Sequence, residues 1–220
     1  MRKLLFFSLV LIGLAGCAHN LVKGYIPPQQ SGDTISHTID APVDKVWTAA
    51  IEALGTQYFE ITHVEKDSGL LTFSYNSNAD PSEFVDCGTA TITETDPYGR
   101  TRDYSYKPEA QFVNISYRVY SSHMSYKDVT YKHDSKVSLK TNLVFKASGP
   151  SQTIVSIASQ YTLAVQTNRR IRVDAKTFQD APPDIIHFST NETGRIGGNM
   201  QCVSRRTFEN NLVEQIKGKI

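Results

Sequence analysis

The sequence has no excess of charge of either sign and no segment long enough to cross a membrane. Its 23 basic and 22 acidic residues nearly cancel, so no strong field would steer the chain toward nucleic acid or another highly charged partner. The longest apolar run, residues 4–14, is shorter than the roughly 20 residues that a membrane-spanning helix needs. We therefore expect neither a nucleic acid partner nor a transmembrane helix.

Motifs that carry chemistry are also missing. The six histidines form no His-x-x-x-His or glutamate-flanked pair, and the sequence has no Gly-x-Ser-x-Gly elbow or phosphate-binding glycine loop. His37 and His63 lie on neighbouring expected strands and could meet, but we assign them no chemistry. We expect no catalytic residue, no metal site and no cofactor, which makes an enzyme the least favoured class of function.

The first residues contain the three regions of a secretory signal peptide in order. A basic start, Arg2 and Lys3, precedes the apolar residues 4–14, and small residues follow in Leu14-Ala15-Gly16-Cys17. This junction resembles the lipobox of bacterial lipoproteins. The resemblance implies cleavage before Cys17, which would then carry the lipid anchor on its sulfur and its amino group. The alternative is an ordinary secreted protein in which the cysteine has no role.

The lipoprotein resemblance also implies a location. Ala18, rather than aspartate, follows the cysteine, and in enteric lipoproteins that pattern sorts the protein to the outer membrane, facing the periplasm. Several acyl chains, palmitate among them, would hold it there, since each buried methylene contributes about 0.8 kcal/mol and a single chain is marginal. We divide the chain into a signal peptide (1–16), a lipidated flexible tether (17–33) and one periplasmic domain (34–220).

Few cysteines remain for other roles. If Cys17 is lipidated, Cys87 and Cys202 are left, and two cysteines in an oxidising compartment most simply pair with each other. A bridge across 115 positions would contribute roughly 4–5 kcal/mol by chain entropy. The alternative is a thiol pair for redox or metal chemistry, but the spacing is not that of a Cys-x-x-Cys motif and no histidines cluster nearby.

One helix is clear in the apolar periodicity. Pro42 suits a first helical turn, and one apolar stripe with helical spacing follows through residue 54, where Gly55 ends it. The stripe consists of Val43, Val46, Trp47, Ala50, Ile51 and Leu54. Trp47 lies in its middle, and we expect it to anchor the core.

The rest of the chain has mostly the period of strands. Strands are expected at 34–39, 58–64, 70–75, 88–95, 113–120, 137–145 and 155–165, and loops at 96–111, 121–135 and 166–200. A short strand at 171–173 is possible within the last loop. A final helix after Cys202 is expected to be capped by Ser204, with Phe208, Leu212, Val213 and Ile216 as its apolar face.

This order of elements predicts an α+β fold. We expect a single helix-grip-like domain, in which a long N-terminal amphipathic helix and a C-terminal helix pack on one face of an antiparallel sheet. The segment 41–47, followed by a hairpin containing 67–71, resembles the helix-grip modules of the C-subunit lipoprotein of the outer-membrane β-barrel assembly machine. The same opening occurs in START-like ligand-binding proteins.

Three classes of function therefore stay open. The chain could be a lipid-anchored interaction module, serving as an accessory or scaffolding subunit of an outer-membrane assembly or secretion complex, with protein partners in the cell envelope. It could instead bind or carry a small apolar ligand in a groove between helix and sheet, or be an enzyme. Two basic clusters, Arg169-Arg170-x-Arg172 and Arg205-Arg206, are interpreted as solvated surface or as contacts to lipid headgroups or an acidic partner.

Overall fold

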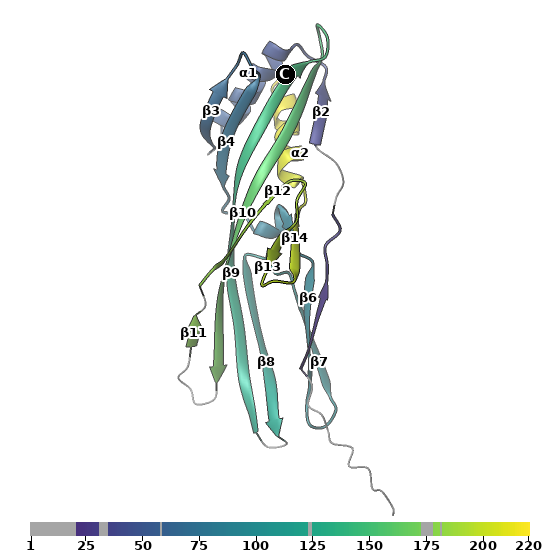
Figure 1. Cartoon of the computed structure of the whole chain (residues 1–220), viewed down its shortest axis with the longest axis vertical. Helices are drawn as coiled ribbons and strands as arrows, with labels where there is room; N and C mark the ends of the chain where they lie inside the picture. The colour runs from purple at the N-terminus through teal and green to yellow at the C-terminus, as the bar shows by residue number, and fades with distance from the viewer. Residues whose placement is uncertain (1–20, 31–34, 58, 123–124, 173–177, 181) are drawn as a thin grey trace, which may run out of the picture.

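The computed structural model describes residues 21–30, 35–57, 59–122, 125–172, 178–180 and 182–220. Cys17 and the expected signal peptide lie outside the described residues. The described chain is elongated, with both helices at one end and long paired strands extending to the other (Figure 1). Within these ranges, no helix is long and apolar enough to cross a membrane.

The centre of the molecule is one long antiparallel hairpin. Strand β9 (Ser125–Ala147) pairs with β10 (Thr153–Arg172) along the whole length of β10. The turn at 148–152 closes this hairpin, with the Ser148 N–H donating to the Gln152 carbonyl at 2.9 Å. Three strands pair with β10: β2 (Ile35–Ile39), β11 (Phe178–Asp180) and β12 (Asp184–Ser189). Two strands, β4 (Leu70–Asn76) and β8 (Phe112–Ser122), pair with β9. Strand β3 (Glu60–Glu65) pairs with β4.

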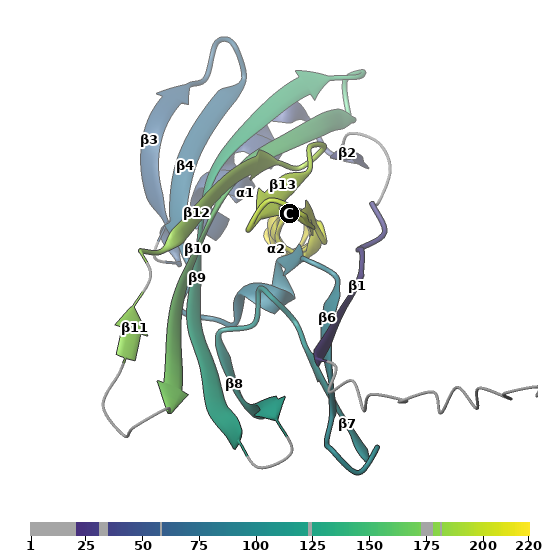
Figure 2. The same cartoon turned by 60° about the horizontal axis from the view of Figure 1, so that its bottom comes forward.

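Two smaller sheets and two helices complete the fold. The first small sheet has the order β1 (Leu21–Ile26), β6 (Thr89–Thr95), β7 (Thr101–Tyr106); the second has the order β13 (Gly194–Ile196), β14 (Met200–Ser204), β5 (Val85–Asp86). The helices are α1 (Val43–Gly55), α2 (Thr207–Lys217) and the single 3-10 turn Pro81–Glu83. Figure 2 shows the first small sheet standing beside the far end of the β8–β9 strands.

Helix α1 forms because its apolar residues share one face. Val46, Ala50 and Leu54 are at most 1% exposed, and they join a large core with the sheet and α2. Trp47 lies edge-to-face against Phe145 of β9, with ring centroids 5.2 Å apart. The prediction of Trp47 as a core anchor is therefore confirmed.

Helix α2 is tied to the sheet by a buried polar cluster as well as by apolar packing. The Glu209 carboxylate is fully buried and accepts the Tyr161 hydroxyl at 2.8 Å and the Thr190 hydroxyl at 3.0 Å. The Ser204 hydroxyl in turn donates to Tyr161 at 2.9 Å. Burial and the nearby Glu209 charge raise the pKa of Tyr161 well above its ordinary value. Both oxygens of the Glu209 carboxylate accept a hydrogen bond, which lowers the cost of burying it in this core.

The strand end of the molecule has its own smaller core, which we call the arm core. It lies between the β6–β7 hairpin and the β8–β9 strands, and its buried members are Ile92, Val113, Ile115, Tyr117 and Val129. From Phe112 to Arg118 the buried residues of β8 alternate with exposed ones, as expected for a strand with one covered face.

The predicted fold class was wrong. The chain is mostly antiparallel sheet, 57% strand and 15% helix, so an α+β description with a long N-terminal amphipathic helix does not fit. Helix α1 lies where the helix was predicted, but both helices are short beside the extensive sheet. The difference comes from segments predicted as loops, which contain β7, the first part of β9, the last part of β10 and β11 to β13. In β7 and the first part of β9 the inward positions hold mostly tyrosine, histidine and serine, so their apolar alternation is weak in the sequence.

Two local predictions also need correction. Part of the tether expected at 17–33 forms strand β1, which pairs with β6. Ser204 does not cap the last helix, because the capping position is held by Arg206 in a left-handed conformation (φ 59°). The Ser204 hydroxyl instead accepts the Arg206 N–H at 2.9 Å. The expected apolar face of this helix is buried as predicted.

We predict that Trp47→Ala lowers the free energy of unfolding by roughly 3–5 kcal/mol, because it leaves a cavity against Phe145. Urea unfolding would measure the loss. Val64→Ala, at a half-exposed position on β3, is the matched control and should change stability by less than about 0.5 kcal/mol. A loss of similar size in both variants would contradict the anchor role of Trp47.

Candidate functional site

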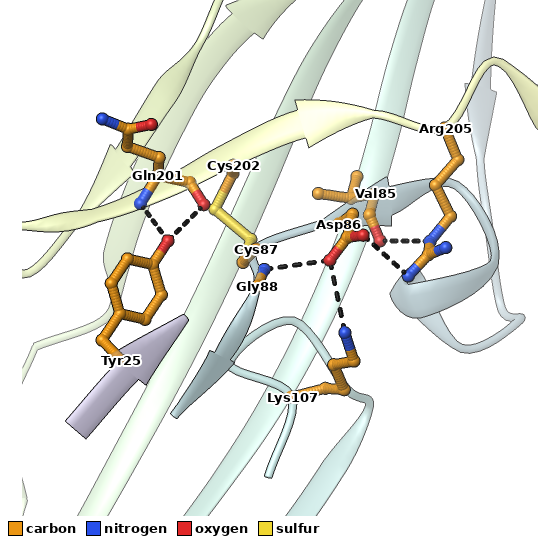
Figure 3. Close-up of a disulfide and its surroundings, with 9 residues drawn as sticks. All are labelled: Tyr25, Val85, Asp86, Cys87, Gly88, Lys107, Gln201, Cys202 and Arg205. Carbon is orange, nitrogen blue, oxygen red and sulfur yellow. Dashed lines mark hydrogen bonds and ion pairs between the residues drawn. A yellow bond between two sulfur atoms is a disulfide. The ribbon is translucent and has the colours of Figure 1, made fainter. Parts of the chain in front are cut away.

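A disulfide joins the middle of the chain to its last strand. Cys87 and Cys202 are bonded, with Cα atoms 3.9 Å apart, and both are fully buried. Cys87 lies between β5 and β6, and Cys202 lies in β14, so the bond links the two small sheets. The predicted pairing is confirmed. Figure 3 shows the disulfide with the polar groups around it, which we call the disulfide junction.

Asp86 gathers the polar contacts of the junction. One carboxylate oxygen accepts the Gly88 N–H at 2.9 Å and lies 3.4 Å from Lys107 Nζ, while the other lies 3.4 Å from the Arg205 guanidinium (Figure 3). Arg205 Nε also donates to the Val85 carbonyl at 3.1 Å. The carboxylate of Asp86 therefore connects the segments just before α2, just after β7 and just before β6.

Strand β1 is fastened to the same junction. The Tyr25 hydroxyl accepts the Gln201 N–H at 2.7 Å and donates to the Gln201 carbonyl at 3.0 Å (Figure 3). Gly88 has φ 78°, and a Cβ there would collide with the carbonyl of Ile26. Only glycine allows both this backbone conformation and this close approach, so Gly88 is what lets β1 lie against the disulfide.

Glu109 is the unusual group of the junction. It is fully buried, and neither carboxylate oxygen makes a hydrogen bond of ordinary geometry with the described residues. Burial raises its pKa to about 7, with nearby Asp86 adding to the rise, while the N–H groups of Glu109 and Cys87 and the charge of Lys107 lower it. Burying a neutral carboxylic acid costs much less free energy than burying a carboxylate. Protonation of Glu109 therefore stabilises the disulfide junction.

An open cleft lies beside the junction, between β7 and β8. Its volume is about 490 Å³, within the range of small binding clefts. Its lining combines apolar and polar groups, and Lys107 is the one charged side chain among the described residues that line it. These residues are Thr89, Ser105, Tyr106, Lys107, Ala110, Phe112, Val113, Asn114 and Ile115. We call it the β7–β8 cleft. Phe112 stands at its edge with 70% of its side chain exposed.

The cleft exists because consecutive strands do not pair. β7 pairs with β6, and β8 pairs with β9. At one end the Lys107–Ala110 turn closes the cleft, with the Ala110 N–H donating to the Lys107 carbonyl at 3.1 Å. Toward the other end, buried Glu94 of β6 accepts the Arg118 N–H at 3.1 Å and the Tyr104 hydroxyl at 3.2 Å. Glu94 thus links the two walls of the cleft.

A second, smaller cleft of about 280 Å³ lies beside Trp47. The Lys66–Asp44 ion pair, 2.9 Å long, stands among its lining residues. The interface between α1 and the sheet is otherwise filled, since Ala50, Leu71 and Leu143 there are fully buried. The groove that an apolar ligand would use beneath the helix is therefore occupied by side chains.

The other residues singled out in the sequence do not come together. His37 of β2 and His63 of β3 are separated by β10, β9 and β4, so the expectation that they could meet was wrong. Arg205 belongs to the disulfide junction, while Arg169 and Arg170 lie exposed on β10. Cys17 is outside the described residues. Among the residues described, no group of three or more histidine, cysteine, aspartate or glutamate side chains could hold a metal ion.

Sequence reasoning missed the groups that form the junction and the cleft. Asp86 stands directly before Cys87, so the predicted disulfide could have pointed to it. Lys107 and Glu109 lie in a segment predicted as loop, in no recognisable motif. Nothing in the local pattern indicates that Glu109 is buried, because its burial comes from strands distant in the sequence.

Comparisons with known proteins give no relative from which a function could be transferred. No protein-family model matches the chain, and no curated protein or solved structure matches it.

We predict a pH-dependent stability that depends on Glu109. Its pKa is about 7 in the folded chain against an ordinary value of 4.5, so the folded state holds an extra proton between these values. The stability contributed by the neutral acid is complete below pH 4.5 and is lost as the pH rises to about 7, a total of roughly 3 kcal/mol.

The measurement is urea unfolding of the wild type and Glu109→Gln across that pH range. The variant has no carboxyl to titrate and should lack this loss of stability. Glu192→Gln, at an exposed position, should follow the wild type. Identical pH profiles for the wild type and Glu109→Gln would show that Glu109 is not the group responsible.

Proposed function

We propose that this protein is a lipid-anchored periplasmic interaction module, an accessory or scaffolding subunit of an outer-membrane assembly or secretion complex. The anchor rests on the signal-peptide pattern and the Leu14-Ala15-Gly16-Cys17 junction. The binding role rests above all on the β7–β8 cleft, an open, mixed polar and apolar surface with an exposed phenylalanine at its edge. Exposed apolar side chains beside unpaired strand edges are typical of sites that receive a partner.

The alternative is a carrier of a small apolar ligand. The side chains that fill the interface beneath α1 argue against it. The cleft beside Trp47 is its best remaining location, but two charged side chains, Asp44 and Lys66, stand among the residues that line it. An apolar ligand would have to remove water from these charges, which is unfavourable. A protein partner is therefore the better interpretation.

We predict that Cys17→Ala abolishes fatty-acid labelling and releases the protein from membranes, because several acyl chains are needed for stable anchoring. Labelling and membrane fractionation in a host with a lipoprotein pathway would measure this. Ala18→Asp is the matched control: it should keep the label but move the protein to the inner membrane. Full labelling of Cys17→Ala would rule out this cysteine as the anchor.

The binding role predicts that the cleft contacts another protein in cells. A photo-crosslinking amino acid at position 112, in place of exposed Phe112, should form a reproducible adduct with a protein. The same group at position 64, where Val64 is also exposed but lies on β3 far from the cleft, should not. Equal crosslinking at both positions, or none at either, would contradict a partner at the cleft.

A further inference from the structure

The direction of the backbone groups along β8 can be fixed from two hydrogen bonds. The Ser135 N–H of β9 donates to the Gln111 carbonyl at 2.9 Å, so the carbonyl of Gln111 faces β9. The Arg118 N–H donates to Glu94 of β6, so this amide points away from β9. Backbone groups of successive strand residues point alternately to opposite sides, and the pairing of β8 with β9 is regular from Phe112 to Tyr120.

The even-numbered residues from Phe112 to Ser116 therefore present their backbone to the edge of β8 that faces away from β9, and Phe112 and Asn114 also line the cleft. Phe112, Asn114 and Ser116 have their N–H and C=O groups on the free edge, and no described strand pairs with that edge. This stretch is about 14 Å long at 3.4 Å per residue. A row of unpaired amides and carbonyls is a template for another strand.

The opposite wall of the cleft limits what can fit. β7 is the edge strand of its sheet and contributes Ser105 and Tyr106 to the lining. If a second folded copy offered its own β8, its β7 would stand across that strand, so the two copies would obstruct one another. A small apolar molecule would leave the backbone groups of β8 covered but unpaired, which is costly. A single extended peptide brings no second strand that would collide with β7, and its backbone can pair with that of β8.

We propose that the β7–β8 cleft binds an extended peptide segment of a protein partner, which pairs with β8 as an added strand. This mode, strand addition to a sheet edge, takes its affinity from main-chain hydrogen bonds and its selectivity from alternate side chains. The proposal rests on the proposed function and specifies the chemical class of the partner.

The lining indicates which peptide is preferred. Lys107 is the charged side chain at the closed end, about 42% exposed, and its 3.4 Å distance to Asp86 leaves it able to make a shorter contact. An acidic side chain or a terminal carboxylate of the peptide fits there. Farther along, Val113 and Ile115 line the cleft only with the small part of their surface that stays exposed, 7% and 8%, and Ala110 lies in the same lining. These positions suit small apolar side chains of the peptide.

The test uses peptides selected from a random display library on the detergent-solubilised full mature chain. Selected peptides should share an acidic residue or a free carboxylate, and their affinity should fall at least tenfold on Asn114→Pro, which removes an edge N–H and spares the ladder to β9. Asn114→Ala, which keeps that N–H, should bind within about twofold of wild type. Thermal unfolding of both variants verifies that they are folded.

A second measurement does not depend on the fold of a variant. The selected peptide is methylated at the backbone nitrogens of alternate residues, in the two possible phases. Methyl groups on the nitrogens that face β8 should abolish binding. Methyl groups on the nitrogens that face away from β8 should weaken binding far less. Equal binding of both phases, or the selection of no peptide, would overturn strand addition.

Two other results would also overturn the proposal. A dimer that becomes monomeric on Asn114→Pro, seen by sedimentation equilibrium, would assign the edge to a second copy. Displacement of the peptide by a fluorescent fatty acid, bound equally by wild type and Asn114→Pro, would assign the cleft to an apolar ligand. If peptides fail while the crosslink at position 112 persists, the partner-binding function stands and only the mode of binding is wrong.

Discussion

The long β9–β10 ribbon is the constraint on which the rest of the molecule depends. Its first segment on β9, from Ser125 onward, supports β8 and the arm core, and its later segment carries β4 and the core around α1. Because the β9–β10 pair passes through both cores, the packing at each end of the molecule helps to fix the position of the same two strands. The hydrogen-bonded ribbon also explains how β8 can keep one edge unpaired: its other edge is held by β9 along its length.

The disulfide junction is the second constraint, and it has an energetic cost. The bond between Cys87 and Cys202 ties β6 and β14 together across a loop of 115 positions, and contributes roughly 4–5 kcal/mol by chain entropy. Against this, Glu109 is buried without adequate partners and prefers to be neutral. The turn that contains Glu109 also closes the β7–β8 cleft, so the least satisfied polar group of the junction lies directly behind the candidate binding surface.

Some of this could be predicted from the sequence, and the reasons are physical. The α1 stripe through Trp47 and the alternation of the β9–β10 hairpin are strong because one face of each is largely apolar. The disulfide followed from there being two candidate cysteines. The strand β7 was missed because only Tyr104 and Tyr106 mark its half-buried face. The first part of β9 places Val129, Tyr131 and His133 inward, an alternation too polar to stand out. The cleft could not be predicted, because it depends on β7 pairing with β6 and β8 pairing with β9 rather than β7 pairing with β8.

The central claim is that β8 is a firmly folded strand with one open edge, and hydrogen exchange of its amides in the free protein tests this most directly. The account predicts an alternating pattern. The amides of Val113, Ile115 and Tyr117, which face β9, should be strongly protected, while those of Phe112, Asn114 and Ser116 should exchange rapidly. Uniform protection along β8 would show that something already covers the edge, and uniform rapid exchange would show that the arm is not stably folded; either result would contradict the account.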